Sequence, residues 1–159
     1  RPESGTVIVG GKQIGKEVDF PDSVGIIIGN PGFLLGLSGF ANLKRLASLK
    51  HCISDDDVRA AMRALGLDPL SKKKGGQYSL GMRERLGIAQ AIMEDPELLI
   101  LDEPFNGLDK QGAGEVCELL RGLKERGKTV LVAAHNMLEI EWLCDTICEM
   151  DVGILTQIK

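Results

Sequence analysis

The chain has 159 residues, of which 43% are hydrophobic and 26% are charged, and its formal net charge is −4. This length and apolar content predict one folded domain with a sizeable core and exclude an intrinsically disordered chain. The acidic balance argues against a nucleic-acid partner, and we interpret the short basic run Lys72 to Lys74 as a solvated loop.

The N-terminal part predicts a hairpin followed by a buried strand. Two short runs on either side of Gly10-Gly11, together spanning Thr6 to Ile14, are typical of a β-hairpin. The β-branched run Val24 to Ile28 predicts a buried strand, which Asn30-Pro31-Gly32 ends.

The segment from about Ser38 to Met93 predicts helices and no strand. Apolar spacing predicts a helix over Ser38 to Leu49, and Ser54 caps a second helix that runs to Leu65. A third helix is predicted over Leu80 to Met93. We therefore expect an inserted helical subdomain at about residues 38–94, with residues 1–37 and 95–159 forming the rest of a single domain.

The second half alternates strands and helices, which indicates a parallel sheet. The predicted elements are a strand over 98–101, a helix over 111–126, a strand over 129–134, a helix over 137–143, and a hairpin of strands 146–150 and 154–158. Ligands of such sheets bind beyond the carboxyl ends of the strands, where Asp102, Glu103 and His135 fall.

Four cysteines are present, and none forms a CxxC pair. With only two histidines, this pattern predicts reduced thiols rather than a disulfide framework or a zinc site. No apolar run approaches 18 residues, so the sequence predicts no membrane-spanning helix.

The strongest local signal is the carboxylate pair Asp102-Glu103 at the end of an apolar strand. The first carboxylate can hold Mg²⁺ beside nucleotide phosphates, and the second can act as a general base toward an attacking water. The alternative is a strand that simply emerges into solvent, where acidic residues are common.

Three further polar features are weaker on their own. Ser79 and Gly81 open a predicted helix, whose free backbone amides suit a phosphate, although an ordinary Ser N-cap has the same pattern. Asn106 to Asp109 predicts a turn that carries a carboxylate. His135 can donate a hydrogen bond to developing phosphate charge, although a lone histidine at a strand end is more commonly structural.

Four segments of the chain resemble, in their order and spacing, the nucleotide-binding domain of ABC transporters. They are Ser79–Arg85, Leu98–Pro104, Gly107–Asp109 and Ala134-His135. The resemblance covers nearly the whole chain, and its wording is similar to the bacterial subgroup that exports peptides and antibiotics. It implies an α/β fold, with a partial parallel-sheet P-loop NTPase core, an inserted α-helical subdomain and a β-hairpin at each end.

The resemblance also implies roles for individual residues. Asp102 would be the Walker B aspartate that serves Mg²⁺, Glu103 the catalytic carboxylate, and His135 the histidine that contacts the γ-phosphate. The nucleotide-binding residues at the dimer interface would be Asp109 and the signature segment, which consists of Ser79, Leu80, Gly81 and Met82. In this family the signature segment contacts ATP held by the partner subunit.

As ligands and partners, the family implies ATP, Mg²⁺, transmembrane permease subunits and a second ATP-binding subunit, with no nucleic acid. Its location would be cytoplasmic, peripheral on the inner face of the cell membrane.

Two departures from the family pattern stand out. The family signature reads Leu-Ser-Gly-Gly-Gln, whereas here Tyr78, Leu80 and Met82 replace its first, third and fifth residues. The glutamine of the family's Q-loop would fall near Gly29, which has no side chain to replace it, and Asn30 is shorter and one position later.

The phosphate-binding motif G-x-x-x-x-G-K-[ST] is absent from the 159 residues. The nearest approximation, Gly5 to Gln13, has its lysine one place late and no Ser or Thr after it. We therefore expect the motif to lie before Arg1 in a longer parent ATPase, and the chain to be inactive alone.

The alternatives are a non-catalytic interaction module, which would supply only signature and membrane-subunit contacts, and a soluble ABC protein of DNA repair or translation. The lack of coiled-coil arms and of a basic surface argues against the latter.

Overall fold

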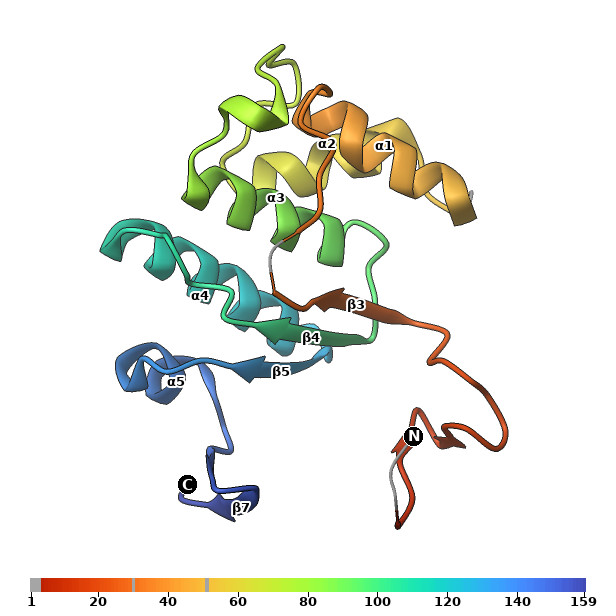
Figure 1. Cartoon of the computed structure of the whole chain (residues 1–159), viewed down its shortest axis with the longest axis vertical. Coiled ribbons are helices and arrows are strands. Elements are labelled where there is room, and N and C mark those ends of the chain that lie inside the picture. The colour runs from red at the N-terminus through yellow and green to blue at the C-terminus, as the bar shows by residue number, and fades with distance from the viewer. Residues whose placement is uncertain (1–3, 30, 51) are drawn as a thin grey trace.

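The computed structural model describes residues 4–29, 31–50 and 52–159, and Figure 1 shows the arrangement of its elements. Their bounds are β1 Ile8–Val9, β2 Lys12–Gln13, β3 Val24–Ile27, α1 Gly39–Lys50, α2 Asp55–Ala64, a 3-10 turn Gly75–Gln77, α3 Leu80–Ile92, β4 Leu98–Asp102, α4 Lys110–Glu125, β5 Thr129–Ala133, α5 Met137–Leu143, β6 Cys148–Asp151 and β7 Ile154–Gln157.

The central sheet is parallel and has the strand order β3-β4-β5, which confirms the predicted α/β class. Its register pairs Val24 with Leu98 and Leu98 with Thr129, so the three strands start at the same edge. They also end at the same edge, where Asp102 pairs with Ala133. The sheet therefore delivers the residues that follow β4 and β5 to one place.

One face of the sheet is covered by helices. The alternate residues Leu99 and Leu101 of β4 are fully buried in a core that they share with α3 and α4. In α4 the buried Val116, Leu120 and Leu123 follow helical spacing, so that helix presents one apolar stripe to this core. The residues of β4 that point the other way are half-buried, and Leu131 of β5 is 59% exposed.

Helices α1, α2 and α3 form a layer above the sheet (Figure 1), in which α1 packs on α2 and α2 on α3. The side chains of Leu43, Met62 and Leu86 are completely buried in this layer. Helix α2 begins where predicted, because Ser54 and Asp57 form a reciprocal capping box.

Antiparallel hairpins lie at both ends of the chain, β1-β2 and β6-β7, as predicted. Their strands are shorter than the runs that predicted them. Helix α4 begins one residue earlier than expected, because the carboxylate of Asp109 caps it. The 3-10 turn Gly75–Gln77 directly follows the basic run Lys72 to Lys74. All four cysteines are free, and no helix in the described residues has the length and apolarity to cross a membrane.

Candidate functional site

The carboxyl ends of β4 and β5 bring the predicted catalytic residues together. The backbone N–H of Glu103 donates to the carbonyl of Ala133 at 2.8 Å, which extends the ladder by one bond past the end of β4. Asp102 is the last residue of β4, and His135 follows β5 by two positions. All three side chains therefore start from the same edge of the sheet.

Glu103 and His135 contact each other directly. The Nδ1 atom of His135 lies 2.9 Å from Oε1 and 2.8 Å from Oε2 of Glu103. The His135 side chain is 81% exposed and that of Glu103 is 38% exposed, so both remain open to a ligand. The sequence placed both residues at this edge but did not predict the bond between them. Because adjacent parallel strands end in register, their strand-end position was the only available signal.

The backbone at Glu103 is unusual, because its φ is +51°. For a residue with a side chain this conformation costs on the order of 1–3 kcal/mol, and such residues occur in turns and cluster at functional sites. It turns the chain sharply at the end of β4, between the residue that ends the strand and the buried Pro104. The position of the Glu103 carboxylate is thus set by a strained turn that the surrounding core maintains.

The Glu103 carboxylate raises the pKa of His135, first through the hydrogen bond and then through Coulombic attraction. Because the folded-state pKa lies above the ordinary 6.5, the pair stabilises the fold fully below that value. This contribution is lost as the pH rises through the folded pKa.

We expect Glu103→Gln to lower the pKa of His135 toward 6.5 in an NMR titration. Glu139→Gln is the control and should lower it less, because Glu139 is the weakest of the raising influences. An unchanged pKa in Glu103→Gln would contradict the pair.

The signature segment begins α3. Ser79 is the N-cap, and its Oγ accepts a hydrogen bond from the backbone N–H of Met82 at 3.2 Å. The ordinary capping role of Ser79 is therefore present. The amides of Leu80 and Gly81 lie in the first turn, where a helix offers N–H groups no internal partner. Ser79 and Leu80 are exposed, so the start of this helix is accessible to an anion.

Asp109 lies at the start of α4, and its Oδ1 accepts from the N–H of Gly112 at 2.7 Å. The turn just before it contacts the signature segment, because Gly81 packs against the carbonyl of Gly107. The predicted site residues thus form two groups. Asp102, Glu103 and His135 share the strand ends, whereas the signature segment lies with Asp109 at the starts of two helices.

Arg85 was given no site role from the sequence, yet it connects three helices. From α3, its Nη1 donates to the carbonyl of Leu65 at the end of α2 at 2.9 Å. Its Nη2 donates to Oε2 of Glu115 in α4 at 2.8 Å. Both partners are distant in sequence, so no local pattern indicated these bonds. Arg85 fixes the direction of α3 relative to α4.

The predicted Q-loop position is only partly described. Gly29 is exposed, with φ at +61°, and Asn30 lies outside the described residues. Pro31 packs against Gly87 of α3, where a methyl group would lie 2.7 Å from the Cγ atom of Pro31. This contact links the segment after β3 to the middle of the signature helix.

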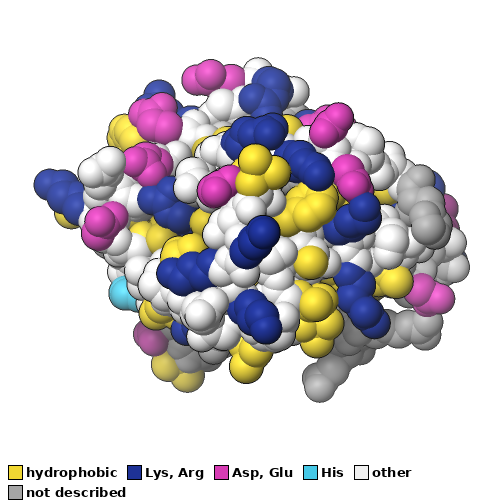
Figure 2. All heavy atoms as spheres, turned by 90° about the horizontal axis from the view of Figure 1, so that it is seen from above, with side chains coloured by type: hydrophobic (Ala, Val, Ile, Leu, Met, Phe, Trp, Pro, Cys, Tyr) yellow, Lys and Arg dark blue, Asp and Glu magenta, His cyan; other side chains and the backbone are white. Residues whose placement is uncertain are grey.

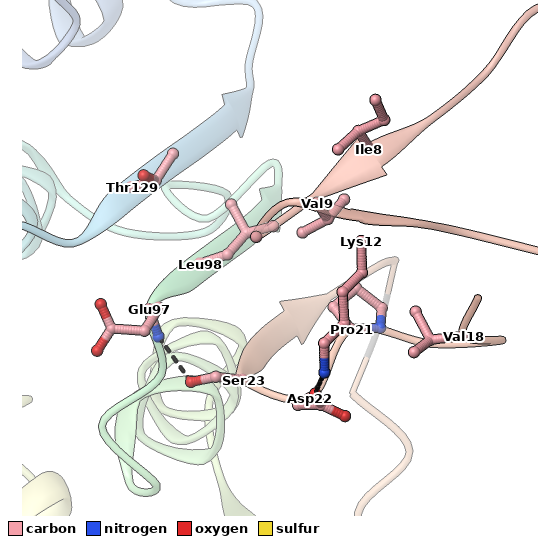
Figure 3. Close-up of a pocket in the computed structure, with 11 residues that line it drawn as sticks. Ile8, Val9, Lys12, Val18, Pro21, Asp22, Ser23, Glu97, Leu98 and Thr129 are labelled. Atoms are coloured by element: carbon pink, nitrogen blue, oxygen red, sulfur yellow. Dashed lines mark hydrogen bonds and ion pairs between the residues drawn. The ribbon is translucent and has the colours of Figure 1, made fainter.

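A cavity of about 570 Å³ lies at the other end of the sheet. Figure 3 shows residues of its lining: Leu98 and Thr129 at the starts of β4 and β5, Ile8 and Val9 of the first hairpin, and Ser23, whose side chain points toward Glu97. The Oγ of Ser23 accepts from the N–H of Glu97 at 2.9 Å. Because parallel sheets bind ligands at their carboxyl ends, this cavity at the amino ends is separate from the candidate site.

Comparisons with known proteins agree with the residue pattern. Residues 1–106 match the family described as ABC transporter. The chain is 40% identical over 154 residues to the uncharacterized ABC transporter ATP-binding protein YybJ of Bacillus subtilis (strain 168), covering 97% of this chain and 71% of YybJ. It is 42% identical over 158 residues to the bacitracin transport ATP-binding protein BcrA of Enterococcus faecalis, covering 98% of this chain and 51% of BcrA.

A solved structure shows the same fold. It is a dimeric ATP-binding cassette in a post-hydrolysis state bound to ADP and Pi, and its TM-score is 0.83 at 18% sequence identity. The match covers 100% of this chain and 75% of the solved one. By comparison, the chain spans about half the length of BcrA.

Proposed function

Because the chain belongs to the ABC transporter family, as the family match and its relatives show, we propose that it forms part of an ATP-binding subunit that couples ATP hydrolysis to membrane transport. The observation that carries this proposal is the Glu103–His135 pair beside Asp102 at the carboxyl end of the parallel sheet. These groups suit phosphoryl transfer to water, because one carboxylate can hold Mg²⁺, the second can act on the attacking water, and the histidine can donate to a phosphate oxygen.

In the proposed reaction, Glu103 accepts a proton from the water that attacks the γ-phosphorus as the bond to ADP breaks. His135 donates a hydrogen bond to a phosphate oxygen, and its raised pKa favours the protonated, donating form. The carboxylate of Asp102 is the kind of hard oxygen ligand that Mg²⁺ prefers, and bound Mg²⁺ would neutralise phosphate charge.

We also propose that the signature segment and Asp109 bind ATP held by a second ATP-binding subunit. The accessible start of α3 supports this role, because its free amides and positive dipole end attract phosphate. The signature segment contacts the turn that leads to Asp109, so both can approach one nucleotide.

Transmembrane permease subunits are the proposed partners of the helical layer. Figure 2 shows hydrophobic side chains between Lys and Arg side chains on the face that this layer presents from above. Leu34, Leu35 and Leu70 are exposed, and the N–H of Gly76, just after the exposed Lys72 to Lys74, donates to the carbonyl of Leu35 at 3.0 Å. This mixture supports docking to a protein at the cytoplasmic face of a membrane. The similarity to BcrA, named for bacitracin transport, supports a peptide or antibiotic cargo.

The missing motif gives a test of the proposal. We expect the full-length protein that contains these residues to bind and hydrolyse MgATP. We expect the 159-residue chain alone to bind MgATP with a Kd weaker than about 1 mM, because it contains no G-x-x-x-x-G-K-[ST] to hold the phosphates. Calorimetry on both proteins, with a phosphate-release assay, makes the comparison. Tight binding by the 159 residues would contradict the role given to the motif, and turnover by the full-length protein would exclude a purely non-catalytic interaction module.

A further inference from the structure

The side chain of Leu80 lies directly over Gly107. A methyl group at position 107 would lie 2.5 Å from the Cδ2 atom of Leu80 and 3.1 Å from its Cβ atom, and would contact Cγ as well. Real Cβ atoms essentially never lie so close to another atom, so a side chain at position 107 would force Leu80, which is 43% exposed, out of its place. The two residues are 27 positions apart, at the start of α3 and in the turn before α4.

A second contact joins the same two segments. A methyl group at Gly81 would lie 2.8 Å from the carbonyl oxygen of Gly107 and 3.3 Å from the Cδ2 atom of Leu108. The absence of a side chain at Gly81 therefore brings the helix start against the backbone of the turn. Leu80 covers Gly107 while Gly81 fits against its carbonyl, so a shift of either segment disturbs both contacts.

The turn that Leu80 contacts is anchored at both ends. Before Gly107, Phe105 is buried in the core, only two residues beyond Glu103. After Gly107, Asp109 caps α4. Further along α3, Arg85 bonds to Glu115 of α4. Arg85 thus joins the bodies of the two helices, and the contacts of Leu80 and Gly81 with the turn join their starts.

We propose that Leu80 is a positioning residue that sets the start of α3 against the turn carrying Asp109, so that both face the nucleotide as one surface. The inference rests on the proposed function and specifies how its nucleotide-binding surface is assembled. It also gives Leu80 a purpose at the position where the family signature has glycine. Leu80 is a spacer matched to Gly107, and the phosphate is left to the backbone amides of the helix start.

The test compares Gly107→Ala, Leu80→Ala and the double variant in the full-length protein. Gly107→Ala is expected to lower kcat for ATP by about tenfold, with KM changed less than about twofold, because the contact positions groups and does not itself hold ATP. Leu80→Ala removes Cγ and Cδ2, the two atoms closest to the new methyl group, and keeps only Cβ at 3.1 Å. The double variant is therefore expected to regain at least about threefold of the lost kcat.

Gly127→Ala is the matched control. Its φ is +87°, close to the +70° of Gly107, but nothing lies within 4 Å of an added methyl group. This variant carries the backbone strain without the collision and should keep kcat within about twofold. Two results would contradict the positioning role of Leu80. One is a kcat for Gly107→Ala equal to that of Gly127→Ala, and the other is a double variant whose kcat is no higher than that of Gly107→Ala.

A readout that is independent of ATP keeps the two proposals separable. Hydrogen exchange at the Gly112 amide, which bonds to Asp109, is expected to be about tenfold faster in Leu80→Ala than in wild type. Leu49→Ala, an exposed leucine of α1, should leave this rate unchanged. A wild-type protein without ATP turnover would refute the proposed function alone. An unchanged Gly112 exchange rate in Leu80→Ala would overturn the contact.

Discussion

Replacing Glu103 with Gln is expected to lower ATP turnover by the full-length protein by about a thousandfold. The substitution keeps the size of the side chain and removes its ability to accept a proton, and a positioned general base contributes on the order of 10²–10⁴ in rate. ATP affinity should be retained or slightly increased, because the change removes one negative charge near the phosphates. Single-turnover phosphate release and equilibrium ATP binding, measured on the same preparation, separate the two effects.

Glu97→Gln is the matched control for this experiment. Glu97 and Glu103 flank the same strand, but Glu97 lies at its amino end, where its carboxylate contacts Lys128 at 3.0 Å. Losing this contact should leave turnover within about twofold of wild type, because Lys128 keeps its ion pair with Asp95 at 3.1 Å and lies at the opposite end of the strand from the candidate site. If Glu103→Gln keeps the turnover of wild type, Glu103 is not the general base. Equal losses in both variants would indicate a general effect of neutralising a carboxylate beside β4.

Local chemistry explains why much of the fold was predictable from the sequence. Ser54 and Ser79 were both expected to begin helices, and both are N-caps, because a Ser hydroxyl satisfies a backbone amide within three residues. The apolar runs at β4 and β5 predicted a parallel sheet, which β3, predicted as a buried strand, joins, and the polar residues after β4 and β5 meet at its edge. These features depend on neighbours in sequence or on the regular geometry of a sheet.

The specific contacts of the site were not predictable in the same way. The bond between Glu103 and His135 joins residues 32 positions apart. The interlock of Leu80 with Gly107 depends on how α3 lies against a turn that follows a different strand. From the sequence, Leu80 was a nucleotide-binding residue of the signature segment that departs from the family pattern, and Gly107 was only a residue of the turn before Asp109. Packing between distant segments gives each of them a second role, and no local periodicity records it.

Helix α3 approaches the sheet closely at Gly25, and Gly25→Ala is expected to lower the free energy of unfolding by about 3 kcal/mol. A methyl group there would collide with the carbonyl oxygen of Ala91 in α3, and would lie 2.8 Å from both the Ala91 carbonyl carbon and the Cδ2 atom of Leu99. Two of these atoms belong to the backbone of a packed helix. They cannot move aside as the end of a flexible side chain can, so α3 must shift away from β3.

Urea denaturation of the full-length protein, followed by circular dichroism, measures this loss, and Gly114→Ala is its control. Gly114 lies within α4 with nothing within 4 Å of an added methyl group, so alanine there should stabilise the fold by about 0.5–1 kcal/mol. Opposite signs for the two variants would locate the effect in the contact between α3 and β3. A loss below about 0.5 kcal/mol for Gly25→Ala would mean that the helix is free to shift.

The same substitution should affect the site. Helix α3 begins at the signature segment, and β3 lies beside the strand that ends in Asp102, so a displacement of α3 would also separate the two groups of site residues. Gly25→Ala should therefore lower ATP turnover even below its unfolding midpoint.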